Sequence, residues 1–188
     1  MSAQHAYRQR SDSRRIAFQM LFSREINELP VEVIFDDGYY CPEIGIPCEF
    51  SRRLLTGTCQ HLQEIDALIS ETTIDWNLMR LPLTDKSILR LAIYEMLFED
   101  DIPTSVSIDE AVEMAKDFGG SEKSPIFING VLGKIACSLQ PDVEPCPEGR
   151  VQIDDEGIAL NDDETVGEGF AKGAPAGLDD VLDDAERV

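Results

Sequence analysis

The stretch 85–98 reads DKSILRLAIYEMLF, and it decides the fold class because it is apolar on nearly every side of a helix. Thr84 precedes it and Ile102-Pro103 follows it, which bounds the helix because the residue before a proline is pushed out of the helical region. A helix that is apolar all round must be surrounded by other helices. The stretch therefore predicts the centre of a helical domain.

Amphipathic segments lie on both sides of this central helix. Before it, apolar residues recur at helical spacing over 14–24 and over 49–72, which predicts a first helix and a long second one, separated by a breaker-rich loop at 26–47. After it, 107–110 reads SIDE, the pattern of a capping box, and a last helix is predicted over 125–139. No strand pattern competes, so the predicted fold class is all-α.

The last 49 residues, 140–188, differ in composition from the rest of the chain. They hold 15 acidic and 3 basic residues, whereas residues 1–139 hold 22 acidic and 13 basic ones. A segment so poor in large apolar groups cannot offset the entropy of ordering its backbone. We therefore expect a helical domain at 14–139, a flexible arginine-bearing arm at 1–13 and a disordered acidic tail at 140–188.

The tail contains one helical pattern, in which apolar residues are spaced on one face among aspartates. These apolar residues are Leu178, Val181, Leu182 and Ala185. About ten residues are too few to hold a helix alone in water, so the segment is either a solvated acidic end or one that folds on meeting a partner. The tail as a whole either solubilises the domain or competes with polyanions for the basic N-terminus.

Charge and composition exclude several classes of protein. A formal charge of −21 excludes a uniformly basic nucleic-acid-binding protein. No apolar run reaches the roughly 20 residues of a membrane span and no apolar signal begins the chain, so we expect a cytoplasmic protein.

The cysteines form no C-x-x-C pair and the only histidines are His5 and His61, so we expect reduced thiols, no metal and no cofactor. The acidic run 99–101 lacks a nearby nucleophile or base and is predicted as a helix-ending turn, not an enzyme site.

The first 24 residues run against the acidic trend, because they carry five arginines and a single acid, Asp12. The arginines are Arg8, Arg10, Arg14, Arg15 and Arg24. Guanidinium groups are planar and permanently charged, and they bind phosphates and stack on bases. The cluster is therefore either a nucleic-acid-binding arm or simply an exposed, solvated N-terminus.

Two longer motifs point to a family. The run LTDKSILRLAIYEMLFEDDIPTSVSIDEAVEMAKDFGGSEKSPIFINGVLGKIA occupies 83–136 and contains the specific segment FINGVL at 127–132, and RRIAFQMLF occupies 14–22. Together they resemble the NusB family of bacterial transcription antitermination factors, whose first helix carries arginines. The resemblance covers residues 8–139. It implies two packed helical subdomains and no catalytic step.

The same resemblance implies partners. It implies a heterodimer with NusE, a ribosomal small-subunit protein, that holds a single-stranded boxA element in nascent ribosomal RNA and helps RNA polymerase read through terminators. Some members of the family self-associate, so a homodimer of the free protein stays open. Asp85 and Arg90 match positions on the NusE-facing helix, and the alternative for both is an ordinary solvated helix face.

The resemblance makes eight residues candidates for contact with RNA. They are Arg8, Arg10, Arg14, Arg15, Phe22, Lys123, Phe127 and Lys134. Phe22 is either a stacking aromatic or a core one. The RNA-binding interpretation requires the guanidinium groups to share one face and to be free of internal ion pairs.

Two departures from the family pattern concern RNA affinity. Pro125-Ile126 stands before Phe127, where family members often carry a lysine, and Gly133 replaces an acid. The alternative function is therefore a NusB-like protein-interaction module with weak or lost RNA recognition.

Overall fold

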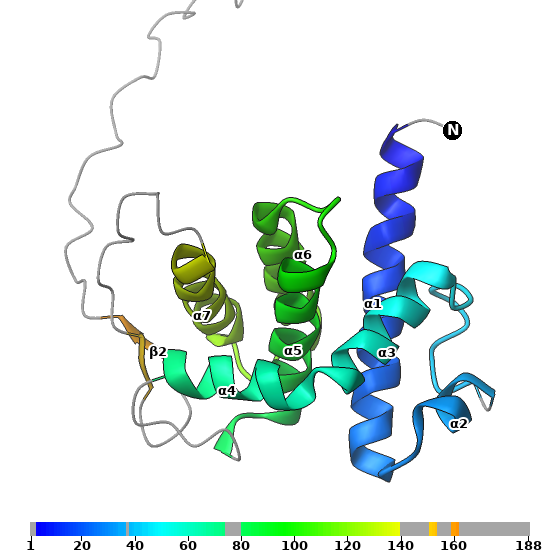
Figure 1. Cartoon of the computed structure of the whole chain (residues 1–188), viewed down its shortest axis with the longest axis horizontal. Helices are drawn as coiled ribbons and strands as arrows, with labels where there is room; N and C mark the ends of the chain where they lie inside the picture. The colour runs from blue at the N-terminus through cyan, green and yellow to red at the C-terminus, as the bar shows by residue number, and fades with distance from the viewer. Residues whose placement is uncertain (1–2, 37, 74–79, 140–150, 154–158, 162–188) are drawn as a thin grey trace, which may run out of the picture.

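The computed structural model describes residues 3–36, 38–73, 80–139, 151–153 and 159–161 of the chain. Helices and one short antiparallel sheet make up this part of the chain (Figure 1). The elements are α1 Ala3–Asn27, α2 Val31–Asp36, α3 Glu49–Gln60, α4 Leu62–Thr72, α5 Leu83–Phe98, α6 Thr104–Phe118, α7 Ser124–Leu139, β1 Val151–Ile153 and β2 Ala159–Asn161. Among these helices, none combines the length and the apolar character that crossing a membrane requires.

Helix α5 forms the centre of the domain, as its all-round apolar sequence predicts. Its Ile88, Leu89 and Ile93 side chains are fully buried. It contacts α1, α3, α4, α6 and α7, so nearly every face of the helix is covered by another helix. The prediction of an all-α domain is confirmed.

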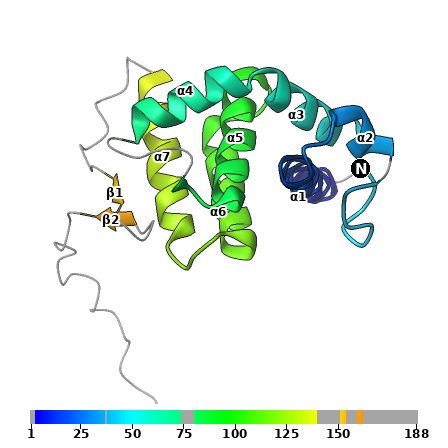
Figure 2. The same cartoon turned by 90° about the horizontal axis from the view of Figure 1, so that it is seen from below.

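Two hydrophobic clusters divide the domain into two packed helical subdomains, as expected. The larger cluster extends over α5, α6 and α7 and includes residues of α1, α3 and α4. The smaller one joins Ile16, Met20 and Leu21 of α1 to Ile34 of α2 and Leu55 of α3. Figure 2, in which α1 is seen almost end-on, shows α1 between α2 and α3 on one side and α5 and α6 on the other. Helix α1 is thus shared by both subdomains.

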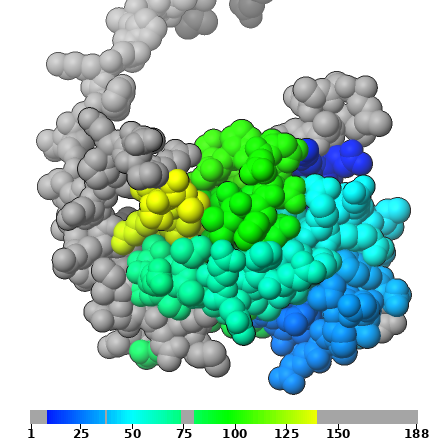
Figure 3. All heavy atoms as spheres, viewed as in Figure 1, coloured from blue at the N-terminus to red at the C-terminus, as the bar shows by residue number. Residues whose placement is uncertain are grey.

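Helix boundaries differ from the sequence prediction at two places. α1 begins at Ala3 and not at Arg14, so the arm that was expected to be flexible is helical from Ala3 onward, because no glycine or proline interrupts 3–27. The helix predicted over 49–72 is broken at His61, whose φ of −104° and ψ of 15° depart from helical geometry. The two resulting helices, α3 and α4, follow one another across the front of the molecule in Figure 3.

A short hairpin follows the helical domain. Val151 pairs with Asn161 and Ile153 with Ala159 in an antiparallel register, and both strands contact α7. The sequence analysis did not foresee this pairing, although V-Q-I alternates apolar and polar residues, and both strands contact α7. The rest of 140–188, including the helical pattern at 178–185, lies outside the described residues.

Candidate nucleic-acid interface

Arg14 lies inside the domain and not on its surface. Its side chain is 3% exposed and donates hydrogen bonds of 2.8–3.1 Å to the carboxylate of Glu95 on α5. The hydroxyl of Ser107 on α6 donates to the same carboxylate at 2.6 Å, and a carboxylate oxygen of Glu110 lies 3.7 Å from the Arg14 guanidinium. The predicted RNA contact of Arg14 is therefore wrong, and the side chain instead joins α1 to α5 and α6.

Ser107 and Glu110 belong to this buried network and not to a capping box. α6 begins at Thr104, so both residues lie inside the helix, and a spacing of three places them on one face. That face is buried against Arg14 and Glu95. The S-x-x-E pattern is the same for a cap and for a buried helix face, which explains the wrong prediction.

Arg10 and Arg15 are accessible cations on different sides of α1. Arg10, with 43% of its side chain exposed, pairs at 2.7 Å with Asp101, in the turn after α5, and its hydrogen bond lowers the pKa of that carboxyl. Arg15, with 27% exposed, pairs at 2.5 Å with Asp117 on α6. At 3.6 residues per turn, the two arginines lie about 140° apart around the helix. The prediction of a single face shared by all the arginines is therefore wrong.

Arg15 shares a stripe of α1 with two other candidates, because Arg8 precedes it and Phe22 follows it by about two helical turns each. The Arg15 guanidinium lies over the ring of Phe118 on α6, 5.7 Å from the ring centroid. Phe118 in turn packs against Phe18 with ring centroids 5.1 Å apart, and Phe18 packs against Phe22 with centroids 6.1 Å apart. This face of α1 therefore combines a cation with aromatic rings.

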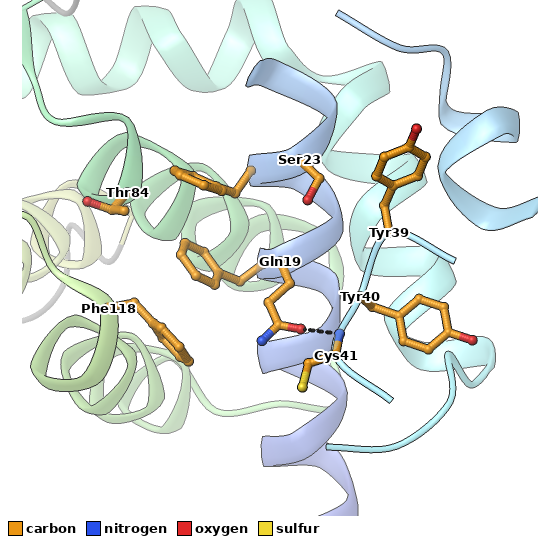
Figure 4. A pocket seen from close by; sticks show the side chains of 9 residues that line it. Gln19, Ser23, Tyr39, Tyr40, Cys41, Thr84 and Phe118 are labelled. Atoms are coloured by element: carbon orange, nitrogen blue, oxygen red, sulfur yellow. Dashed lines mark hydrogen bonds between the residues drawn. The ribbon is translucent and has the colours of Figure 1, made fainter. Parts of the chain in front are cut away.

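A groove lined by aromatic side chains continues this stripe. We call it the aromatic groove; its volume is about 360 Å³ and its lining is mostly apolar. The lining residues are Phe18, Gln19, Phe22, Ser23, Tyr39, Tyr40, Cys41, Thr84 and Phe118. Figure 4 shows Thr84 and Phe118 on one side of α1 and Tyr39, Tyr40 and Cys41 on the other, where Gln19 accepts a hydrogen bond from the Cys41 backbone N–H. The sequence analysis missed Phe118 and the tyrosines, although paired tyrosines in a breaker-rich loop were an available signal.

Asp85 holds the turn between α6 and α7. Its buried carboxylate accepts hydrogen bonds from the Gly120 backbone N–H at 2.9 Å and from the Ser124 hydroxyl at 2.8 Å. The turn packs so closely that a Cβ at Gly120 would lie 2.6 Å from Pro82. The predicted interface role of Asp85 is therefore wrong, but its contacts fix the turn in which Lys123 is exposed.

Arg90 is also held inside the domain. Its guanidinium donates to Asp66 on α4 at 2.6 and 2.7 Å and pairs with Glu25 on α1. Burial lowers the pKa of Arg90, but the hydrogen bonds and charges of these two carboxylates outweigh it and raise the pKa above its ordinary value. The predicted interface role of Arg90 is wrong, because the residue ties α1, α4 and α5 together.

The remaining candidates have different environments. Phe127 is buried in the larger hydrophobic cluster, so its predicted RNA contact is wrong. Lys134 is partly exposed on α7, and the side chain of Arg8 lies outside the described residues. Cys41, Cys48, Cys59 and Cys137 are free thiols. Within the described ranges, no group of histidine, cysteine, aspartate and glutamate residues could hold a metal ion.

The fold and this surface define a class of small helical-bundle proteins in which one long helix serves two subdomains and presents a cationic, aromatic face. The profile of the NusB family matches residues 11–137, and the chain belongs to this family. The chain is 41% identical over 133 residues to the protein named transcription antitermination protein NusB in Pseudothermotoga lettingae, covering 71% of this chain and 94% of that protein. It is 43% identical over 133 residues to the protein of the same name in Geobacter sulfurreducens, covering 69% and 94%.

Solved structures agree with this assignment. NusB of T. maritima superposes with a TM-score of 0.59 at 40% identity, over 68% of this chain and 89% of that one. A chain from a crystal structure of the antitermination factors NusB and NusE in complex with double-stranded RNA superposes with a TM-score of 0.60 at 24% identity, over 69% and 96%. The second likeness supports the fold.

Proposed function

We propose that this chain is a cytoplasmic, non-catalytic transcription antitermination factor that binds single-stranded boxA-like RNA together with NusE on the elongating RNA polymerase. Relatives whose names state a role in antitermination align with this chain over almost their full length. The observation in the structure that carries the proposal is the stripe of α1 on which Arg15 lies against Phe118 and continues into the aromatic groove.

Because the arginines do not all share one face and Arg14 is buried in an ion pair, the proposed RNA-binding part is reduced to Arg15, Lys123 and, by its place in α1, Arg8. Arg15 is accessible, and its partner Asp117 is an exposed carboxylate. Exposed ion pairs contribute little, so a phosphate can replace Asp117 while the guanidinium stays on the Phe118 ring. Lys123 lies in the turn after α6, the helix that ends at Phe118, and adds a second positive charge there.

NusE is assigned to the aromatic groove in this proposal. The groove is open and mostly apolar, which suits a protein partner better than a phosphate backbone. It continues the stripe that carries Arg15, so a protein seated on it lies beside the bound RNA. This chain alone offers few cations to RNA. Because a second subunit at this place extends the RNA-binding surface, it strengthens the weak binding of RNA.

The RNA part is tested by titrating labelled single-stranded boxA-like RNA in a salt series, with and without NusE. If three cations contact phosphates, log affinity should fall with log salt with a slope of about −2, from roughly −0.7 per contact. Arg15→Gln should weaken binding and make the slope less steep by about 0.7. Arg52→Gln is the matched control, because Arg52 is an exposed arginine on α3 that stacks on Phe35 of the smaller subdomain.

Equal binding by wild type, Arg15→Gln and Arg8→Gln, each assayed with NusE, would instead support the protein-interaction module without RNA recognition. One observation favours that alternative, because Arg14, which the sequence placed at the centre of the cationic cluster, is buried in an ion pair.

The NusE part is tested by Thr84→Arg, which puts a long charged side chain into the groove at the first turn of α5. NusE binding should fall strongly, while the affinity of the isolated protein for RNA should not fall below the wild-type level, because the new side chain is a cation. Unchanged NusE affinity would remove the groove from the proposal.

A further inference from the structure

A second groove lies between the beginning of α6 and the last turns of α7, and it shares no residue with the aromatic groove. We call it the α6–α7 groove, and its volume is about 530 Å³. Its lining residues are Ile102, Pro103, Thr104, Ser105, Ile108, Ala136 and Cys137. Ile102, Pro103, Ile108 and Ala136 form apolar walls, and Thr104 and Ser105 add hydroxyl groups, so the groove fits a ligand with an apolar face and polar flanks.

The N-terminus of α6 brings free backbone amides to this groove, and the exposed Asp100 and Asp101 stand just before it. The residue before the helix, Pro103, has no side chain that can cap it, and no acidic residue lies in the first turn. The backbone amides of Val106 and Ser107 bond to the Pro103 carbonyl, whereas those of Thr104 and Ser105 have no bond to a described residue outside the helix. Free amides and the helix dipole favour carboxylates at such an end.

The chain itself contains a segment with this combination of features. Residues 178–185 read LDDVLDDA, with apolar residues at positions one, four, five and eight and aspartates between them. In a helix these apolar residues form one stripe and the aspartates flank it. The segment is too short to be a stable helix alone, but docking of an amphipathic helix into an apolar groove supplies the missing contacts.

The path of the tail brings this segment within reach. α7 ends at Leu139, two residues after the groove residue Cys137, and the strands β1 and β2 contact α7 again. The 16 residues of 162–177 then separate the hairpin from Leu178. As a flexible coil they span roughly 22 Å, from about 5–6 Å times the square root of their number. We propose that segment 178–185 docks as a helix in the α6–α7 groove of its own chain.

The test uses Cys137 as a reporter, because this free and partly exposed thiol lines the groove. Its alkylation rate by iodoacetamide is measured by peptide mass spectrometry in the full-length chain. The variant Leu178→Asp/Leu182→Asp breaks the apolar stripe of the segment. If Cys137 reacts only when the segment is undocked, the variant should raise the alkylation rate of Cys137 by the total population divided by the undocked population, on the order of threefold to tenfold.

The matched control is Val166→Asp/Phe170→Asp, which makes the same change of charge in the same tail outside the segment. It should leave the rate at Cys137 unchanged, and Cys41, which lines the aromatic groove, should react equally in all variants. Equal rates at Cys137 in wild type and in Leu178→Asp/Leu182→Asp would overturn the proposal. Protection that grows with protein concentration would also overturn it, because the occupant would then come from another chain.

Discussion

Replacing Arg14 by leucine tests the buried network that joins α1 to α5 and α6. The substitution removes the guanidinium that pairs with Glu95 and leaves the Ser107 hydroxyl as the one other described donor to that carboxylate. It also leaves the buried Glu110 without its cation. Breaking a buried ion pair by removing one partner costs about 3–5 kcal/mol, so we expect the free energy of unfolding to fall by about that amount.

The loss is measured by urea unfolding followed by circular dichroism. The double variant Arg14→Leu/Glu95→Leu should recover part of it, since apolar replacement of both partners of a buried pair is often neutral. Arg10→Ala serves as a control and should have a much smaller effect, because its ion pair with Asp101 is exposed. A loss below about 1 kcal/mol for Arg14→Leu would refute the reasoning, because that is the value of a pair in solvent.

Glycines and cysteines allow three more predictions. Gly57→Ala should lower the melting temperature and cost about 1–3 kcal/mol, because its Cβ would lie 2.1 Å from the Tyr94 ring; a melt like that of wild type would contradict this contact. Gly133→Ala should stabilise α7 by about 0.5–1 kcal/mol in the same assay, since nothing lies within 4 Å of its Cβ; a lower melting temperature would count against it. Cys48 should be alkylated faster than Cys59 near neutral pH. Burial raises the pKa of both thiols, but hydrogen bonds from serine hydroxyls and backbone N–H groups outweigh it at Cys48 and bring that pKa below its ordinary value; equal rates would contradict this order.

Much of the fold could be predicted because it depends on local patterns. The apolar positions of 85–98 repeat on every side of a helix, and the structure buries Ile88, Leu89 and Ile93 accordingly. The break at His61 was missed because the apolar spacing continues through it from Leu54 to Ile65, both of which are buried in the same cluster. The pattern shows which residues face the core, but it does not show where the backbone turns between them.

The candidate site was harder to predict because the fate of a charged residue depends on partners far away in the sequence. Arg14 and Arg15 are neighbours with the same side chain, yet one pairs with buried Glu95 and the other with exposed Asp117. Arg14 is buried and Arg15 is accessible because their side chains point in different directions around α1. The contacts of α1 with α5 and α6 decide which of these directions faces the core. Family resemblance pointed to the arginines of α1, but it did not separate the buried Arg14 from the accessible Arg10 and Arg15.

The unbroken course of α1 has a consequence for cooperation between ligands. Its 25 residues form one rod of about 37 Å that belongs to both cores, so an occupant near Arg15 and another near Phe22 meet a surface that is already assembled. Mutual strengthening would then arise from direct contact between the two occupants and not from a change of shape relayed through the protein. A short covalent tether between the two occupants should therefore reproduce most of the affinity that each occupant adds to the binding of the other.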